Sequence, residues 1–422
     1  MSIEQYYLNE FNIQREERSR IRHDSLNDNY DVQNCKIICF FAEKGGVGKT
    51  TNAQTLAYTF AENGHRVVIC DCDSQRSLTA SILGLEITAN PDNFVDVLDP
   101  LGEIINQQNI DNERYVSSLY DQVRSNNNII KPAHAILIRE NLWLVPGDRN
   151  ISELDQIISN EELASSPNFD FIHHNNSKTG KPYQAILRTA EEYQADYVFL
   201  DLSPNKGPFN RCLVMASHYV IISATADYHS AEMMSNVEEN FTNWCRKTNE
   251  IRNIFSMPNR MPIFNLPESN PKFLGFILNR VDSNKIGEIV NGIEDNRYRR
   301  IEQFWAKRVQ HGANNLSMLS QFLDDENYRE PLLCPMAVSN ETYERCNRTN
   351  RIGVVRQFWG LKNFSDAVHI PVPFLNERHI IEFDNDRVRQ VRNNEQINSI
   401  ETFRRVFDEI YKTIKRIIAA DD

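Results

Sequence analysis

The feature that most constrains this chain is a glycine-rich segment at residues 44–51. It separates an apolar, β-prone run at residues 37–41 from a helix-prone run at residues 52–62. Glycines let backbone N–H groups surround an anion without a Cβ in the way. The start of the following helix presents unpaired N–H groups and the positive end of its dipole to the same anion. A strand, a glycine-rich turn and a helix in this order predict a phosphate-binding loop.

The side chains of this segment add the chemistry that a nucleotide requires. Lys49 supplies a mobile positive charge for the outer phosphates, and Thr50 offers a hydroxyl group to Mg²⁺. A second lysine, Lys44, stands at the start of the segment, and one of residues 41–43 replaces the first glycine of the ordinary loop. The predicted cradle consists of Gly45, Gly46, Val47, Gly48, Lys49, Thr50 and Thr51.

The pattern K-G-G-V-G-K-T-T at residues 44–51 resembles the deviant Walker A motif of the ParA/MinD family of ATPases. In that family the signature lysine, here Lys44, crosses to the nucleotide of a partner subunit in a sandwich dimer. The resemblance therefore implies catalytic roles for both Lys44 and Lys49. It also implies that ATP controls dimerisation, a switch between two states with different contacts.

A second motif follows the apolar run at residues 67–71, which is typical of a strand buried on both faces of a parallel sheet. Residues 71–75 read D-C-D-S-Q and resemble the D-x-D-P-Q element of the same family, with Ser74 in place of proline. The resemblance implies that Asp73 orients the attacking water and that Asp71 lies in the magnesium shell or bonds to the phosphate-binding loop. The residues alone allow an alternative, a strand-end aspartate that caps the next helix.

A third motif consists of four apolar residues that end in Asp201. This run resembles the Walker B pattern, in which a buried strand places one carboxylate beside magnesium. The resemblance implies that Thr50, Asp201 and Asp71 are the metal ligands. In the family this strand leads into a mobile switch, which corresponds here to residues 205–208.

Two positions are candidates for contact with the base of the nucleotide. Asn279 lies in the buried strand expected at residues 273–282 and resembles the family's asparagine near the adenine. An asparagine at a strand end is equally well explained as a turn residue. Pro371 ends a run at residues 367–371 that resembles the family's Ile-Pro element near the base. The cofactors implied by all these motifs are ATP and Mg²⁺.

Composition excludes several other classes of protein. The formal net charge is −12, so the surface is not uniformly basic and any contact with nucleic acid must use a local patch. No apolar run approaches the roughly 18 residues that would indicate a membrane span. The eight cysteines lack the spacing of metal ligands, so we expect a cytoplasmic protein with reduced thiols.

The order of the motifs predicts an α/β fold with a mostly parallel, twisted sheet flanked by helices and a helical insertion. We assign residues 1–35 to a polar arm, 36–283 to the ATPase core, 284–361 to the insertion and 362–422 to the end of the core and a C-terminal amphipathic helix. Residues 166–182 are rich in Asn, His, Ser and Gly and are predicted to form a surface loop.

The C-terminal helix carries one apolar stripe, made of Phe403, Phe407, Ile410, Ile414 and Ile417. Three interpretations compete. The helix packs on the core, its basic face touches DNA, or it anchors the chain to a membrane. We rank the anchor last, because the stripe is aromatic and β-branched like an ordinary core.

The motifs together most resemble those of ParA-type partition ATPases. The resemblance implies an Mg²⁺-dependent ATPase that forms an ATP-dependent homodimer, binds DNA non-specifically and drives plasmid or chromosome partition with a ParB-like activator. Such a protein is cytoplasmic and associates with the nucleoid. The alternative is a ParA/MinD-like ATPase that positions or regulates a protein or membrane cargo, or acts in a defence complex. We do not expect a membrane partner.

Overall fold

The structure is a computed structural model of the 422-residue chain. It describes residues 30–83, 118–125, 129–163, 171–255, 266–281, 305–306, 308–309, 311–313, 351–356, 360–376, 380–383, 387–390 and 394–421. The predicted N-terminal arm lies outside the described residues except for positions 30–35, and so does most of the predicted insertion.

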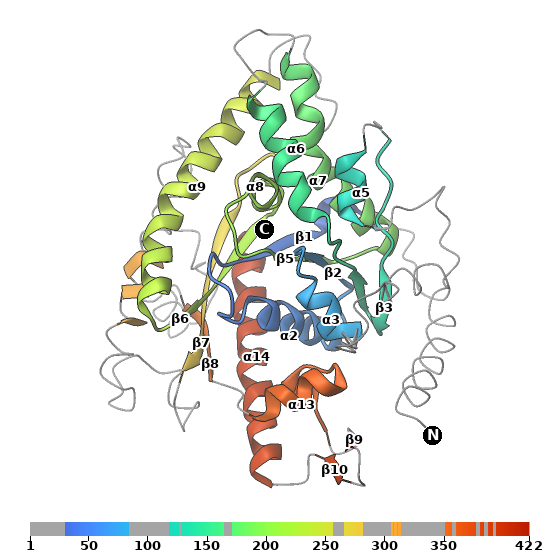
Figure 1. Cartoon of the computed structure of the whole chain (residues 1–422), viewed down its shortest axis with the longest axis vertical. Coiled ribbons are helices and arrows are strands. Elements are labelled where there is room, and N and C mark those ends of the chain that lie inside the picture. The colour runs from blue at the N-terminus through green and yellow to red at the C-terminus, as the bar shows by residue number, and fades with distance from the viewer. Residues whose placement is uncertain are drawn as a thin grey trace, which may run out of the picture.

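The centre of the molecule is an eight-stranded sheet with the order β3-β4-β2-β5-β1-β6-β7-β8 (Figure 1). All neighbouring strands are parallel except β3 and β4. This confirms the predicted α/β class. The strands are β1 (Lys36–Phe41), β2 (Val67–Cys72), β3 (Ile136–Arg139), β4 (Leu142–Val145), β5 (Tyr197–Leu202), β6 (Tyr219–Thr225), β7 (Lys272–Val281) and β8 (Arg351–Arg356).

Three of the four central strands are buried along their whole length. All six residues of β2, all six of β5 and all seven of β6 are buried, as continuous apolar runs predict for a sheet covered on both faces. Strand β1 pairs with β5 on one side and with β6 on the other. The chain therefore changes direction across the sheet at β1, and the crevice at its carboxyl end is where ligands bind in such sheets.

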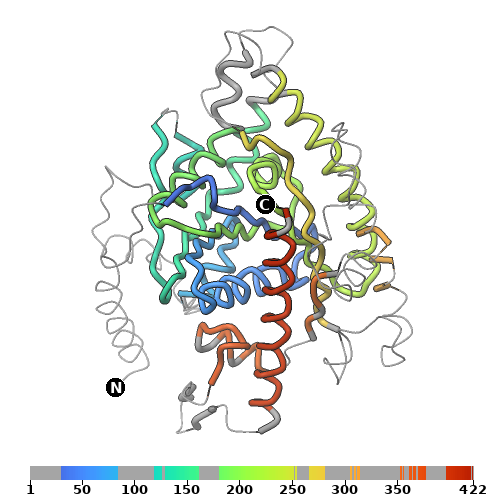
Figure 2. The backbone as a smooth tube through the Cα atoms, turned by 180° about the vertical axis from the view of Figure 1, so that it is seen from behind, coloured from blue at the N-terminus to red at the C-terminus, as the bar shows by residue number. Residues whose placement is uncertain are grey.

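Helices cover both faces of the sheet (Figures 1 and 2). One face packs against α5 (Leu119–Arg124), α6 (Ile151–Leu163), α7 (Phe171–Tyr193), α8 (Pro208–Met215) and α9 (Tyr228–Phe255). The other face packs against α2 (Lys49–Glu62), α3 (Ser77–Leu83) and α14 (Asn394–Asp421). Helix α13 (Gly360–Val368), the short 3-10 turns η1 (Val32–Asn34) and η2 (Val372–Phe374), and the hairpin of β9 (Ile380–Phe383) and β10 (Arg387–Gln390) complete the described elements.

Helix α14 buries the predicted apolar stripe against the sheet. Phe407 and Ile414 are fully buried, and Ile410 packs so closely on Gly353 of β8 that a Cβ there would collide with its side chain. This confirms the interpretation of a helix packed on the core. The stripe is therefore not exposed for a membrane, and no helix among the described residues is long and apolar enough to cross a bilayer.

Two segments differ from the sequence predictions. Residues 351–356 fall within the predicted helical insertion but form β8, which pairs with β7 in the main sheet. Residues 171–182 were predicted as loop but belong to helix α7, which continues through Pro182 to Tyr193. The second half of α7 buries Ala185, Ile186 and Ala190 in the core. Packing of that half on the sheet extends the helix into a segment whose composition alone favours a loop.

Candidate functional site

The glycine-rich loop lies at the carboxyl end of β1 and leads directly into α2, as predicted. Gly46 and Gly48 have φ values of 75° and 90°, a left-handed conformation that favours glycine. Gly48 is the N-cap residue of α2, and no side chain caps this helix start. The first N–H groups of α2 are therefore left to face a ligand, which is the arrangement that binds anions.

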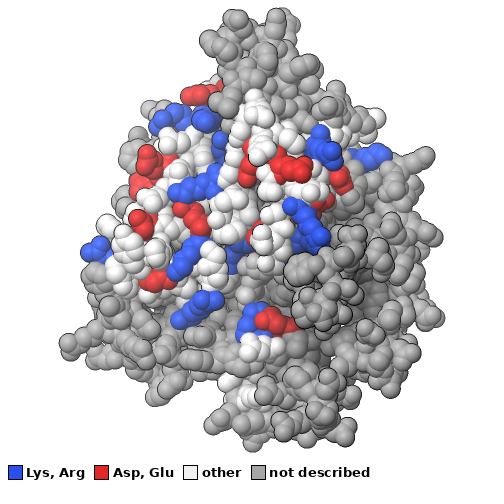
Figure 3. Space-filling model, viewed as in Figure 1, with Lys and Arg blue, Asp and Glu red and all other residues white. Residues whose placement is uncertain are grey.

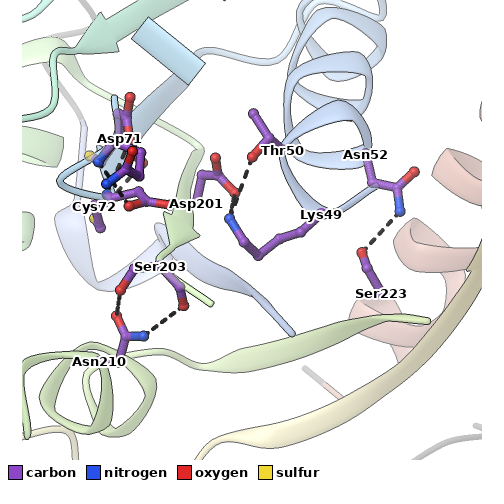
Figure 4. Close-up of polar contacts among 12 residues, drawn as sticks. Lys49, Thr50, Asn52, Asp71, Cys72, Asp201, Ser203, Asn210 and Ser223 are labelled. Atoms are coloured by element: carbon purple, nitrogen blue, oxygen red, sulfur yellow. Dashed lines mark hydrogen bonds and ion pairs between the residues drawn. The ribbon is translucent and has the colours of Figure 1, made fainter. Parts of the chain in front are cut away.

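Lys49 forms a buried ion pair beneath the loop (Figure 4). Its Nζ donates to Oδ1 of Asp201 at 2.5 Å, and the two side chains are only 7% and 1% exposed. Asp201 follows the four apolar residues at the start of β5, so the third sequence motif meets the first at this point. The nearby hydroxyl of Thr50 lies 3.5 Å from Lys49 Nζ.

The same group of atoms fits a divalent cation. Oδ2 of Asp201 is buried and has no hydrogen-bond partner among the described residues. A carboxylate oxygen beside a threonine hydroxyl is the type of oxygen donor that Mg²⁺ prefers. The two residues present therefore suit the metal that the sequence predicts.

Asp71 forms hydrogen bonds to the start of the next helix. Its Oδ2 accepts hydrogen bonds from Thr79 N at 2.8 Å and Thr79 Oγ1 at 2.7 Å, and its Oδ1 accepts from Asp73 N at 3.1 Å. Thr79 lies in the first turn of α3, so Asp71 acts as the cap that the sequence left open as an alternative. Burial, followed by the nearby charge of Asp201, raises the pKa of Asp71 to about 7. Magnesium binding by Asp71 stays a prediction.

Asp73 lies at the wall of the site. Its Oδ1 accepts a hydrogen bond from Gln75 N at 3.0 Å, and the residue is 8% exposed. Burial is the main cause that raises the pKa of this carboxyl above its ordinary value. A carboxylate with a raised pKa at a cavity wall is suited to accept a proton from water.

Lys44 does not share the partner of Lys49 and pairs instead with a carboxylate in the turn after β6. Its Nζ lies 2.8 Å from Oδ2 of Asp227, and the two side chains are 38% and 36% exposed. Asp227 also accepts hydrogen bonds from Thr225 Oγ1 at 2.5 Å and Ser230 N at 2.9 Å. Burial alone would raise the pKa of Asp227, but these hydrogen bonds, that from Lys44 first, lower it.

The loop that follows β5 is held in place on both sides. Asn210 of α8 donates to the backbone oxygens of Ser203 and Asn205 at 2.8 and 2.9 Å (Figure 4). Lys206 forms an ion pair of 2.8 Å with Glu43, the residue just before Lys44. The predicted switch, residues 205–208, is thus connected to the start of the phosphate-binding loop.

A cavity of about 640 Å³ opens above the loop. Every predicted loop residue except the buried Val47 lines it, and so do Lys44, Asp73 and Asn279. Asp201 and Asp71 lie beneath the lining, and Pro371 is buried beside η2 and does not line the cavity. The lining residues that the sequence did not indicate are Gln75, Ser77, Pro204, Arg280, Val355, Lys362 and Asn363.

Asn279 packs directly on the loop. A Cβ added to Gly48 would lie 3.0 Å from Cγ of Asn279, and Asn279 Nδ2 donates to Ile277 O at 3.2 Å. The side chain therefore stabilises the end of β7 as well as the cavity wall. Contact of Asn279 or Pro371 with a base stays a prediction.

The fold and the loop together define a P-loop nucleotide-binding protein of the α/β class. A family model described as an AAA domain matches residues 35–254, just over half of the 422 residues. The chain belongs to this family, and its phosphate-binding loop is of the ParA/MinD type.

Two curated relatives and one solved structure illustrate the similarity. An uncharacterized protein of Methanocaldococcus jannaschii is 26% identical over 207 residues, which are 48% of this chain and 65% of that protein. The chromosome partitioning protein ParA of Myxococcus xanthus is 26% identical over 200 residues, 47% of this chain and 56% of that protein. The chain thus spans less than two thirds of the length of either relative. The crystal structure of a Corynebacterium diphtheriae protein, 18% identical, shares the fold with a TM-score of 0.52 over 79% of this chain and 97% of that one.

Proposed function

We propose that this chain is a ParA-like ATPase that binds MgATP, dimerises in that state and is reset when ATP is hydrolysed to ADP and phosphate. The observation that carries the proposal is the different placement of two lysines in one loop. Lys49 is buried beneath the loop with Asp201, whereas Lys44 is partly exposed at the cavity wall and pairs with Asp227. A nucleotide site shared by two subunits needs one lysine fixed beneath its own nucleotide and a second lysine that can reach the nucleotide of the partner. The two lysines of this loop are suited to these two tasks.

The residues around the cavity account for binding of a triphosphate. The free N–H groups of the loop and of α2 surround the phosphates, and Lys49 exchanges Asp201 for phosphate oxygens. Thr50 and Asp201 are the residues that would hold Mg²⁺, which supplies positive charge to the phosphate oxygens when it is bound. Removal of Lys49 from Asp201 leaves that carboxylate available for this role.

Asp73 is the residue that handles the proton of the attacking water. It is the only carboxylate among the described residues that line the cavity. Its raised pKa makes the carboxylate a better proton acceptor than an exposed aspartate. The hydrogen bond from Gln75 N fixes one oxygen and so orients the other.

Dimerisation is assigned to Lys44. In this structure its amine is held by Asp227, which has two further hydrogen-bond donors and remains satisfied when Lys44 leaves. An exposed ion pair of this kind contributes only about 0–1 kcal/mol, so the lysine is easily redirected to a nucleotide in a second subunit.

Non-specific DNA binding and a ParB-like activator are proposed from the family and from the partition protein among the relatives. On the face in Figure 3, the described Lys and Arg residues are interspersed with Asp and Glu. Several basic residues of α14 are already paired: Arg404 with Glu62, Lys412 with Glu409 and Lys415 with Tyr197. The DNA part of the proposal therefore rests on family membership.

The test combines light scattering with DNA retention. We expect the wild type to be a dimer with a non-hydrolysable ATP analogue and Mg²⁺, and a monomer with ADP. Lys44→Ala should stay monomeric while it still binds the analogue. Lys412→Ala is the matched control, because its ion pair of 2.9 Å is similarly exposed but lies on α14. A wild type that stays monomeric with the analogue would contradict the proposal.

The mixed charge of the described face favours a second candidate, an ATPase of the same type that positions a protein cargo. DNA retention separates the two. Binding to a random duplex that requires ATP and weakens steeply with added salt supports partition. Dimerisation without such retention supports a protein cargo.

A further inference from the structure

Arg280, at the end of β7, has a backbone conformation that arginine seldom adopts. Its φ is 56°, in the left-handed region, and the residue is exposed. Residues other than glycine pay a steric cost in this region, and such positions cluster at functional sites. Side chains alternate between the two faces of a regular strand, and the left-handed turn breaks that alternation after Asn279. Two consecutive side chains are thereby brought over the phosphate-binding loop.

The guanidinium group of Arg280 lies against the crest of that loop. A Cβ added to Gly46 would be 3.6 Å from Nη2 and 3.9 Å from Nη1 of Arg280. Asn279 approaches Gly48 more closely, because a Cβ there would lie 3.0 Å from its Cγ. Both terminal nitrogens of the arginine thus lie within van der Waals distance of the position a Cβ would take on Gly46, beside the backbone that surrounds the phosphates.

The charges around the cavity distinguish Arg280 from the other cations that line it. Lys49 is paired with Asp201, Lys44 with Asp227, and Lys362 with Asp366. Within the described part of the chain, Arg280 has no carboxylate partner. A bound phosphate gains this charge without breaking an ion pair, whereas Lys49 must first leave Asp201.

We propose that Arg280 is a phosphate-binding residue that contacts the terminal (γ) phosphate of the bound nucleotide. Its planar fork of N–H donors matches phosphate oxygens in pairs, which a lysine amine does not. Gly46 precedes Lys49 in the loop, and the amine of Lys49 is the group that reaches the outer phosphates of a bound nucleotide. Thr51 lies at the other end of the loop, inside α2, on the side of the inner phosphate. The inference rests on the proposed nucleotide binding and adds a residue to it.

The left-handed backbone of Arg280 allows a test in which the variant is not expected to lose stability. Arg280→Gly removes the guanidinium group and relieves the left-handed strain at once, so its melting temperature should equal or exceed that of the wild type. Arg280→Gln keeps most of the side chain without the charge. Arg405→Gln is the matched control, because Arg405 has an 81% exposed side chain on α14, with a weak ion pair of 3.9 Å to Glu401.

The readout is the dissociation constant of ATPγS and of ADP, measured by calorimetry with Mg²⁺. We expect both Arg280 variants to bind ATPγS about tenfold or more weakly, the value of a hydrogen bond to a charged group, and to bind ADP within about threefold of the wild type. Arg405→Gln should leave both constants unchanged.

Three other results would contradict the inference. If Arg280→Gly binds ATPγS within about twofold of the wild type, Arg280 does not touch the nucleotide. If ATPγS and ADP weaken equally, the contact is not with the γ-phosphate. If the wild type itself binds neither nucleotide, the proposed function fails and the inference with it. Because the wild type is measured separately, these failures are distinguishable.

Discussion

Two lysines of one loop, five residues apart, are held in opposite ways. Lys49 and Asp201 are almost fully buried, and their charged atoms are 2.5 Å apart. Lys44 and Asp227 are each more than a third exposed, and their charged atoms are 2.8 Å apart. The lengths are similar, but the surroundings differ. A buried pair cannot lose one partner without leaving an uncompensated charge, whereas an exposed pair is screened by water.

The difference teaches which part of the loop is fixed and which part can move. Lys49 stays beneath the loop until a ligand supplies equal negative charge. Lys44 leaves Asp227 at little cost, because Thr225 and Ser230 continue to satisfy the carboxylate. We call Lys49 and the carboxylates near it, Asp201 and Asp73, the inner half of the site, which is built for binding. Lys44 and Asp227 belong to the outer half, which is suited to a change of partner.

The largest expected effect is a loss of stability when Lys49 is removed from the inner half. Lys49→Ala leaves the charge of Asp201 buried and unpaired, so we expect it to lower the free energy of unfolding by about 3–5 kcal/mol. Urea denaturation followed by circular dichroism measures this. The double variant Lys49→Ala/Asp201→Asn removes the stranded charge and should regain much of the loss. A single variant within about 1 kcal/mol of the wild type would show that the pair is not buried in solution.

The next effect concerns catalysis within the same half. Asp73→Asn keeps the shape of the side chain but removes the proton acceptor, so steady-state ATP hydrolysis should fall by about 10²–10⁴-fold. Binding of ATPγS should change little, because Asp73 is held by the N–H of Gln75 and forms no ion pair with another described residue. A variant that still hydrolyses ATP at more than a tenth of the wild-type rate would remove Asp73 from the mechanism.

Much of the inner half could be predicted from the sequence, because its parts are local. Continuous apolar runs that end in Asp71 and Asp201 indicate buried parallel strands, and the loop follows directly from β1. Parallel strands bring their carboxyl ends to one edge, so Lys49 and Asp201 meet although 152 positions separate them. The fold class and the meeting of the two motifs at one edge of the sheet follow from this rule.

The outer half could not be predicted, because its contacts depend on tertiary packing. Asp227 lies in an unremarkable turn after β6, and nothing in its neighbourhood marks it as the partner of Lys44. The position of Arg280 depends on one left-handed residue, which the sequence around Asn279 does not signal. Strand β8 could not be predicted for a related reason. It is a short run at the edge of the sheet, and its pairing is with β7.

A smaller effect tests the electrostatics beneath the loop through pH. The folded pKa of Asp71 is about 7, above the ordinary value of 3.8. Between these values the folded state keeps a proton that the unfolded state loses. Rising pH therefore favours unfolding, and the loss is complete above about pH 7.

The matching measurement is denaturation of the wild type and of Asp71→Asn from pH 5 to pH 8 in the presence of a chelator. Relative to the variant, the wild type should lose on the order of 1–3 kcal/mol across this window. Parallel curves for the two proteins would show that Asp71 stays ionised in the folded state, and would place its carboxylate in contact with solvent or with a cation.

The smallest effect on stability belongs to the outer half and completes the contrast. Lys44→Ala should change the free energy of unfolding by only about 0–1 kcal/mol, because the pair is exposed and Asp227 keeps two donors. Lys412→Ala, with a more exposed pair on α14, should give a change that is equally small or smaller. If Lys44→Ala destabilised the chain as strongly as Lys49→Ala, Lys44 would be a structural residue, fixed in place and unable to reach a second nucleotide. A small change for Lys44→Ala beside a large one for Lys49→Ala would mean that one loop holds its two cations by different means, Lys49 by a buried ion pair and Lys44 by an exposed one.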